Sequence, residues 1–206
     1  MSDDLIEVPF RDYDNIRAYA EDFLSRYHPQ RLIPVPIERI VELGMGIDII
    51  PVHGLKDAID SDGYISNHFQ SIAMDLRIYK EYDNRRRFTI AHEIGHMVMH
   101  KQILEKFEFE SIEEWKGFVT SIDPKQYSHL EVQANKFAGL VLVPSGQLHE
   151  MYVKAEAMVL DSGFTRVEMP DMFNGFACRW LAQKFSVAER TVEIRLKLEG
   201  IIKDEI

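Results

Sequence analysis

Residues 87–100 read Arg-Phe-Thr-Ile-Ala-His-Glu-Ile-Gly-His-Met-Val-Met-His, and this stretch contains the strongest signal in the sequence. Its apolar side chains recur at the spacing of a helix with one broad buried face. They are Phe88, Ile90, Ala91, Ile94, Met97 and Val98. The helical pattern begins near Asp83 and runs to His100, so the stretch predicts a long core helix.

Two histidines lie four residues apart on this helix, with a glutamate after the first. Residues at this spacing share one helix face, with about 6 Å of axial rise between them. His92 and His96 can therefore bind one Zn²⁺, whose bonds to nitrogen are about 2.0–2.1 Å long. Glu93 then lies beside the open position of the metal, where a carboxylate can accept a proton from a water, as in zinc peptidases. The motif predicts two metal ligands and a catalytic base.

A tetrahedral zinc site needs a third protein ligand besides water. His100 is about 12 Å from His92 along an unbroken helix, which is too far for a shared metal. We expect His100 to pack, or to cap the helix C-terminus as a partly charged imidazole. The acidic candidates downstream are Glu105, Glu108, Glu110, Glu113, Glu114 and Glu131. Most of the first five lie in a charge-rich segment typical of a solvated face, whereas Glu131 opens an apolar helix over residues 128–143.

The spacing around Glu131 allows two interpretations. A carboxylate on a buried helix is costly unless it is paired or bound to a metal, which favours a ligand. However, Ser128 and Glu131 also fit a capping box, in which Glu131 would only satisfy the start of the helix. Spacing alone favours neither. Asn135 lies one turn later and can hydrogen-bond the outer nitrogen of His92 or His96, or else join two helices as a buried polar group.

The remaining patterns predict an α+β fold, mainly helical, with a small three-stranded sheet before the histidine helix. The predicted strands span residues 46–51, 63–66 and 71–75. A helix over residues 37–43 is expected to end at Gly44. Other predicted helices span residues 14–27, 110–118, 128–143 and 145–159, and a last pair, 176–185 and 187–198, resembles a helix-turn-helix. Residues 161–163 and Pro170 mark a loop.

Composition narrows the class of protein. A chain of 206 residues that is 46% hydrophobic and 28% charged is not disordered, and none of its apolar runs approaches the length of a membrane span. The acidic N-terminus lacks a secretory pattern, and the single cysteine, Cys178, is expected in the core. We therefore expect a cytoplasmic protein whose metal is held by His and carboxylate. The net charge of −10 disfavours DNA and anionic lipid as partners.

Two motifs in combination resemble the ImmA/IrrE family of metallopeptidases. The first spans residues 87–96, and the second comprises Glu131, Ala134, Asn135, Phe137 and Ala138, followed by residues 142–144. Shorter similarities over residues 34–38, 44–47, 181–187 and 195–196 extend the resemblance from about residue 15 to about residue 202. The resemblance implies a zincin-like metallopeptidase domain over residues 1–160. It also implies a C-terminal helical segment, residues 161–206, packed on that domain.

The resemblance also implies a function. In the family, the glutamate that opens the second motif completes a His-His-Glu zinc site, which makes Glu131 the third ligand beside His92 and His96. In related gluzincins, an acidic residue at the place of Asn135 orients a ligand histidine. Zn²⁺ is the expected cofactor, although Mn or Fe can use the same ligands. Studied members cut a helix-turn-helix transcriptional repressor in a stress or mobile-element response, so a repressor is the expected protein substrate.

The alternative is a non-catalytic, metallopeptidase-like regulator that binds a partner protein or DNA. Residues 177–206 carry a net charge of +1, so we expect packing or partner docking from the last helices, and DNA binding is not expected. The basic run of residues 85–87 is expected to be solvated or ion-paired. Candidate donors to a developing oxyanion are Tyr64, Tyr127, His129 and His149, and the sequence does not choose among them.

Overall fold

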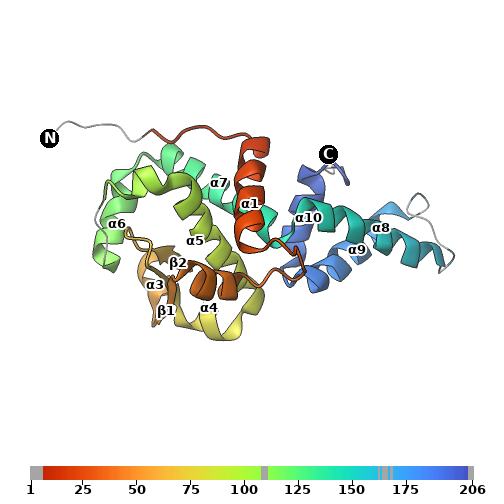
Figure 1. Cartoon of the computed structure of the whole chain (residues 1–206), viewed down its shortest axis with the longest axis horizontal. Helices are drawn as coiled ribbons and strands as arrows, with labels where there is room; N and C mark the ends of the chain where they lie inside the picture. The colour runs from red at the N-terminus through yellow and green to blue at the C-terminus, as the bar shows by residue number, and fades with distance from the viewer. Residues whose placement is uncertain (1–6, 108–110, 162, 164–166, 168, 204–206) are drawn as a thin grey trace.

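The computed structural model describes residues 7–107, 111–161, 163, 167 and 169–203. It confirms the α+β class: the described chain is mostly helical, with one small three-stranded sheet (Figure 1). The elements before the histidine helix are α1 (Tyr13–Tyr27), α2 (Ile37–Arg39), η1 (Ile40–Met45), β1 (Asp48–Val52), α3 (Leu55–Ile59), β2 (Gly63–Ile65), β3 (Ser71–Asp75) and α4 (Leu76–Glu81). The others are α5 (Asp83–Leu104), α6 (Ile112–Ser121), α7 (Pro124–Leu142), α8 (Ser145–Asp161), α9 (Pro170–Phe185) and α10 (Glu189–Leu198).

The sheet is mixed, with strand order β1-β3-β2. β1 pairs with β3 in parallel, and β2 pairs with β3 in antiparallel fashion, so that Tyr64 lies opposite Ala73. β2 is therefore an edge strand, and it packs on α5. A Cβ at Gly63 would lie 3.1 Å from the Thr89 side chain, so the missing side chain lets the strand approach the helix closely. All three predicted strands are confirmed to within two residues.

The core is built around α5 and α7. Where they meet, a Cβ at Gly95 would lie 3.3 Å from the Cα atom of Ala134 and 3.0 Å from the Phe137 ring. The two helices can come this close because residue 95 has no side chain. On its other side, α7 packs against α1, and the rings of Phe23 and Phe137 meet edge to face with centroids 5.8 Å apart. Phe137 is completely buried.

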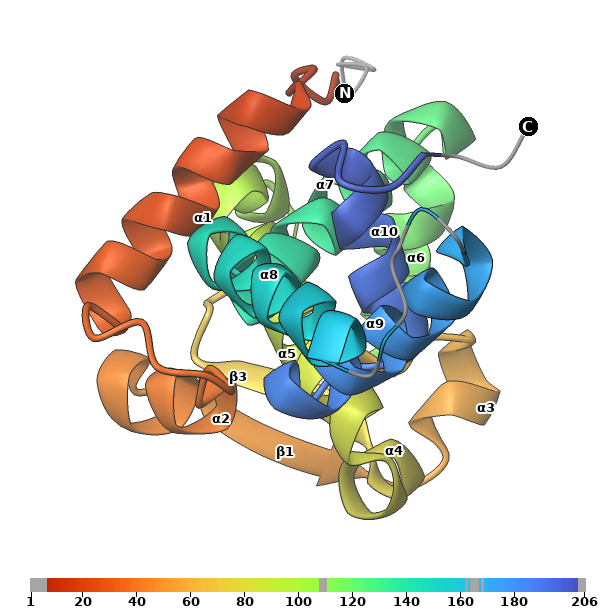
Figure 2. The same cartoon turned by 90° about the vertical axis from the view of Figure 1, so that its right-hand side faces the viewer.

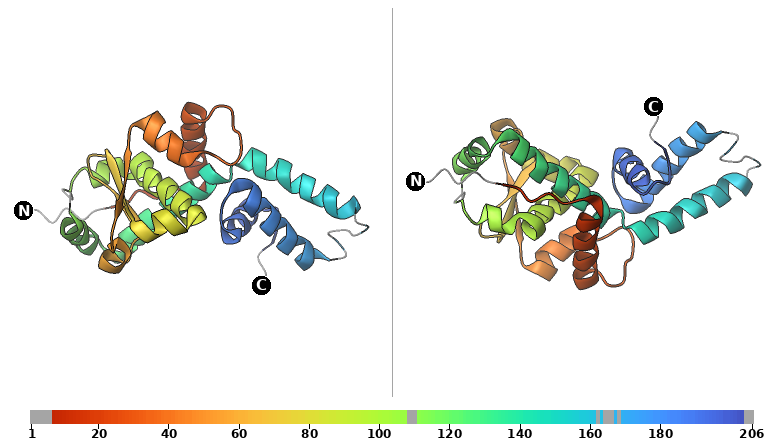
Figure 3. Two further views of the ribbon diagram at one scale, coloured as in Figure 1. Left: turned by 90° about the horizontal axis from the view of Figure 1, so that it is seen from below. Right: turned by 90° about the horizontal axis from the view of Figure 1, so that it is seen from above.

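The C-terminal helices form a second group beside this core. α8 and α9 run side by side away from the sheet, and α10 turns back towards α7 (Figures 2 and 3). Arg195 of α10 lies over Gly139 and is completely buried, where it donates to the Val143 carbonyl and pairs with Glu199 at 2.8 Å. Cys178 lies in the core of this group, as predicted.

Several helix boundaries differ from the predictions. The helix expected to end at Gly44 widens into the π-helix η1 and ends at Gly46, which adopts φ +69°, a conformation that glycine tolerates best. The last two helices were predicted over residues 176–185 and 187–198. The first begins earlier, at Pro170, and the second begins two residues later, at Glu189. Pro170 fits the first turn of a helix, because the N–H groups of that turn have no partner within the helix and proline lacks this group. Part of the predicted 161–163 loop lies outside the described residues.

The basic run before the histidine motif is ion-paired, as expected. Arg85 pairs with Asp62, and Arg86 pairs with Asp83 at 2.9 Å. Arg87 is buried, which was not predicted. Its guanidinium is satisfied there because it donates to the backbone carbonyls of Val35 and Ser186 at 2.7 and 3.1 Å. It thereby joins the N-terminal part and the α9–α10 turn to the first turns of α5.

Replacing Gly95 by alanine tests the close contact of α5 with α7. Overpacking costs about 1–3 kcal/mol, while the better helix propensity of alanine returns about 1 kcal/mol. We expect Gly95→Ala to be less stable than the parent by about 1 kcal/mol in urea unfolding. The matched control is Gly117→Ala on α6, where a Cβ meets nothing within 4 Å, and it should be more stable. Equal stabilisation of both variants would contradict the contact.

Candidate metal centre

Three of the predicted site residues converge between α5 and α7. The Nε2 atoms of His92 and His96 lie 3.0 Å apart, and each lies 3.3 Å from a carboxylate oxygen of Glu131. Ligand atoms about 2.0–2.1 Å from a tetrahedral zinc are about 3.3 Å from one another. Among the residues that the structure describes, no other group of three His, Cys, Asp or Glu side chains is close enough to hold a metal.

The capping-box interpretation of Glu131 is wrong. α7 begins at Pro124, four residues before Ser128, and its N-cap is Asp123, whose carboxylate accepts from the backbone N–H groups of Lys125 and Gln126. Glu131 lies two turns inside the helix, where the backbone N–H groups are already bonded. Its side chain is free to face α5.

Of the other acidic candidates, those that the structure describes do not join the two histidines. Glu105 pairs with Lys101, and Glu114 closes the capping box of α6 with Ser111. Glu113, in the first turn of α6, is not part of the converging group. Glu108 and Glu110 lie outside the described residues.

The outer nitrogens of both histidines are held by polar partners. Nδ1 of His92 lies 3.0 Å from the side-chain oxygen of Asn135, which places Asn135 where the sequence predicted a supporting residue. Nδ1 of His96 lies 3.1 Å from Nδ1 of His100. Of the two expectations for His100, packing is confirmed, because the side chain is buried, and a charged cap is wrong, because α5 continues to Leu104. Burial, with the neighbouring His96, lowers its pKa to about 3, so the ring is neutral at pH 7.

The hydrogen bonds behind His100 fix where the ring protons lie. The amide of Gln133 donates to the Pro9 carbonyl at 3.0 Å, and its oxygen accepts from the Arg11 guanidinium at 3.0 Å. That oxygen is also 3.1 Å from Nε2 of His100, which must therefore carry the ring hydrogen. A neutral His100 then accepts at Nδ1 from the Nδ1–H of His96. In the neutral ring, this leaves a lone pair on Nε2 of His96 facing Glu131, where a metal ion, or a proton that is hydrogen-bonded to the carboxylate, can bind.

The electrostatics of the cluster favour a cation. Burial raises the pKa of Glu131, but its hydrogen bonds with His92 and His96 outweigh this and hold the pKa well below its usual range. Burial lowers the pKa of His92, but the hydrogen bond that the protonated ring donates to Glu131 and the charge of Glu93 outweigh this effect, so the pKa is raised. A carboxylate and imidazole lone pairs this close repel one another unless a proton or a metal ion lies among them. The donor set therefore fits a divalent metal.

Glu93 lies beside this cluster and is held by the sheet. Its Oε2 atom accepts from the backbone N–H of Ile65, in edge strand β2, at 2.9 Å. The side chain is buried, and burial raises its pKa against the opposing charges of His92 and His96. A carboxylate with a raised pKa holds a proton more readily, as a residue that accepts and returns protons requires. The role of Ile65 was not predicted. The donor is its backbone N–H, which every residue except proline has, so the type of residue gives no indication of it.

Two of the four suggested oxyanion donors lie at the site. Tyr64 and Tyr127 line a cavity of about 40 Å³ together with His92, His96 and Glu131. Burial and Glu131 raise the pKa of Tyr127, so its phenol stays protonated and can donate. His129 and His149 are exposed, and His149 bonds to the Ser145 carbonyl of its own helix at 2.8 Å. Both imidazoles are outside the cavity.

Comparison with known families agrees with this geometry. The peptidase family model described as the IrrE N-terminal-like domain matches residues 79–197, more than half of the chain. The chain therefore belongs to the ImmA/IrrE family and carries a metallopeptidase-type domain. No curated protein matches the chain significantly. Within the described residues, no helix is long and apolar enough to cross a membrane.

Replacing Gln133 by methionine tests the hydrogen-bond chain behind His96. Without the amide, Nε2–H of His100 is no longer required, so we expect a mixture of ring tautomers at His96 in ¹⁵N NMR. Loss of such a partner lowers metal affinity about 10–100-fold. Zn²⁺ affinity, measured by competition with a chelator, should fall by that factor, while Gln183→Met, at an exposed position, leaves it unchanged. An unchanged His96 spectrum in Gln133→Met would refute the chain.

Proposed function

We propose that the protein is a zinc-dependent peptidase that hydrolyses a peptide bond in a specific protein substrate. The observation that carries the proposal is the convergence of His92, His96 and Glu131 at the spacing of a tetrahedral metal site. These three residues would hold Zn²⁺, the usual occupant of a His₂Glu set. Family membership supports a peptidase.

The residues around the centre have distinct tasks in this proposal. Zn²⁺, when bound, supplies a Lewis acid that polarises a carbonyl and lowers the pKa of a water to about 7. Glu93 accepts a proton from the attacking water and returns it to the leaving amine. The Ile65 N–H orients the Glu93 carboxylate for this exchange. Asn135 and His100 hold the rings of His92 and His96.

The substrate is proposed to be a helix-turn-helix transcriptional repressor, as in the family. The cavity at the centre holds only about 40 Å³, which favours a narrow choice of side chain next to the scissile bond. We do not include DNA among the partners, because basic side chains of the last two helices are paired within the protein: Arg179 with Glu189, and Arg190 with Glu193. A cytoplasmic location and regulation by cleavage belong to the same proposal.

Metal content tests the ligand set. The purified protein should contain about one Zn²⁺ per chain by elemental analysis. His92→Ala and Glu131→Ala should lose it, because two remaining ligands bind zinc weakly. His149→Ala, an exposed histidine outside the site, is the matched control and should keep it. A wild-type chain that takes up no zinc would refute the site, and retention in Glu131→Ala would remove Glu131 from it.

Glu93→Gln tests the catalytic base. The amide keeps the size of the side chain but cannot accept the proton, so cleavage of a proteome-derived peptide library should fall by about 10²–10⁴-fold or more. Zinc content should be unchanged. Glu150→Gln, on the exposed face of α8, should cleave normally. Undiminished cleavage by Glu93→Gln would exclude Glu93, while a zinc-loaded wild type that cleaves nothing would favour the non-catalytic regulator.

A further inference from the structure

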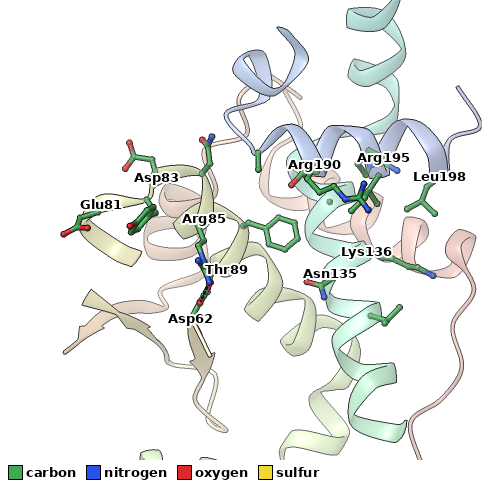
Figure 4. A pocket seen from close by; sticks show the side chains of 18 residues that line it. Asp62, Glu81, Asp83, Arg85, Thr89, Asn135, Lys136, Arg190, Arg195 and Leu198 are labelled. Atoms are coloured by element: carbon green, nitrogen blue, oxygen red, sulfur yellow. Dashed lines mark hydrogen bonds and ion pairs between the residues drawn. The ribbon is translucent and has the colours of Figure 1, made fainter. Parts of the chain in front are cut away.

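A groove of about 1090 Å³ lies beside the metal centre, in the corner between α5, α7 and α10. Figure 4 shows Arg85 and Thr89 on one side, Asn135 and Lys136 on α7 opposite them, and Leu198 on α10 across the top. The groove is much larger than the cavity at the histidines. Its volume is slightly above the usual range for ligand sites in proteins, which is about 300–1,000 Å³.

The groove adjoins the space in front of the candidate centre, and the two share part of their lining. That space, of about 250 Å³, is lined by His92, Glu93 and Glu131. Five residues line both the groove and this space: Asp62, Arg85, Phe88, Thr89 and Asn135. A polypeptide that crosses the centre can therefore pass over Asn135 into the groove.

The lining of the groove is largely apolar and exposed. Val132 on α7 and Ile194 and Leu198 on α10 are 46%, 42% and 37% exposed. Ile194 and Leu198 are four residues apart, so they form a stripe on one face of α10. Single exposed apolar side chains are common on protein surfaces, but a group of them in one hollow indicates a binding surface.

The charges at the rim are largely satisfied within the protein. Arg85 pairs with Asp62, Arg190 with Glu193 at 2.8 Å, and Glu81 with Arg77 at 3.2 Å. A highly charged ligand would have to compete with these pairs. A phosphate backbone would also meet three carboxylates, those of Asp62, Glu81 and Asp83. The lining therefore suits apolar side chains on a segment whose other side faces water.

We propose that this groove binds the apolar side of an amphipathic segment of the protein substrate, next to the bond that is cleaved. The inference rests on the proposed peptidase function, because the lining that the groove shares with the metal centre points to the substrate chain as the occupant. α10 thereby contributes to substrate selection although it supplies no ligand. Recognition by apolar anchors in a groove between helices is an established mode of peptide binding.

The test is a selection of displayed peptides on the zinc-loaded Glu93→Gln chain, which is expected to bind without cutting. Enriched peptides should carry two or more apolar residues on one side. Their Kd should rise at least tenfold in chains that also carry either Ile194→Glu or Leu198→Glu. Both changes are at the surface, and the same rise is expected for each. Val153→Glu, at a position 62% exposed on α8 and outside the groove, is the matched control and should bind as before.

Each other outcome overturns one proposal and not the other. Absence of any enriched peptide, or equal binding by the groove variants and their parent, overturns the groove. So does a dimer that light scattering shows to be broken by Ile194→Glu, or binding of a DNA duplex that the same change abolishes. Peptides that bind the groove but are not cut by the wild-type chain, even when extended on both sides, overturn the peptidase and leave the groove. If the groove variants cleave as well as their parent, the groove proposal is overturned and the peptidase proposal stands.

Discussion

The close contact between α5 and α7 at Gly95 and Ala134 is the constraint on which the site depends. A Cβ at residue 95 would already lie 3.3 Å from the Cα atom of Ala134, so even alanine would require its neighbours to shift by a few tenths of an ångström. Glu131 precedes Ala134 by three residues and therefore reaches His92 and His96, which lie on either side of Gly95. The three converging atoms are thus held by two packed helices, which move less than loops do.

A buried polar network behind the histidines adds to this rigidity. Arg11 and Pro9, from the segment before α1, fix the amide of Gln133, which orients His100 and through it His96. Each member has a partner, so the network does not pay the large cost of an unsatisfied buried polar group. On the opposite side, edge strand β2 holds Glu93 through one backbone N–H. The catalytic machinery of the proposal therefore depends on the N-terminal segment, the sheet and both central helices.

The same packing sets the surroundings of the site. α10 returns to α7 because the buried Arg195 lies over Gly139 and pairs with Glu199. This return leaves a corner in which Phe88, Val132 and Ile194 face one hollow beside the centre. In sequence, α9 and α10 resemble a DNA-binding helix pair. In the structure, α10 forms a wall of the proposed substrate groove, and its Arg190, Arg195 and Lys197 pair with nearby carboxylates.

The features of this protein that depend on local backbone geometry could be predicted from its sequence. The spacing of His92 and His96 puts both rings on one helix face, because the helix period is fixed by the backbone. Short runs of strand-forming residues marked the three strands. Glu131 was ambiguous, since the true start of α7 at Asp123 and Pro124 could not be told from the false one at Ser128. Gln133, Arg11 and Ile65 gave no signal at all. Only the tertiary structure decided their roles, because they meet the site across 28 or more residues of chain, and such contacts follow from how helices pack and not from spacing along one of them.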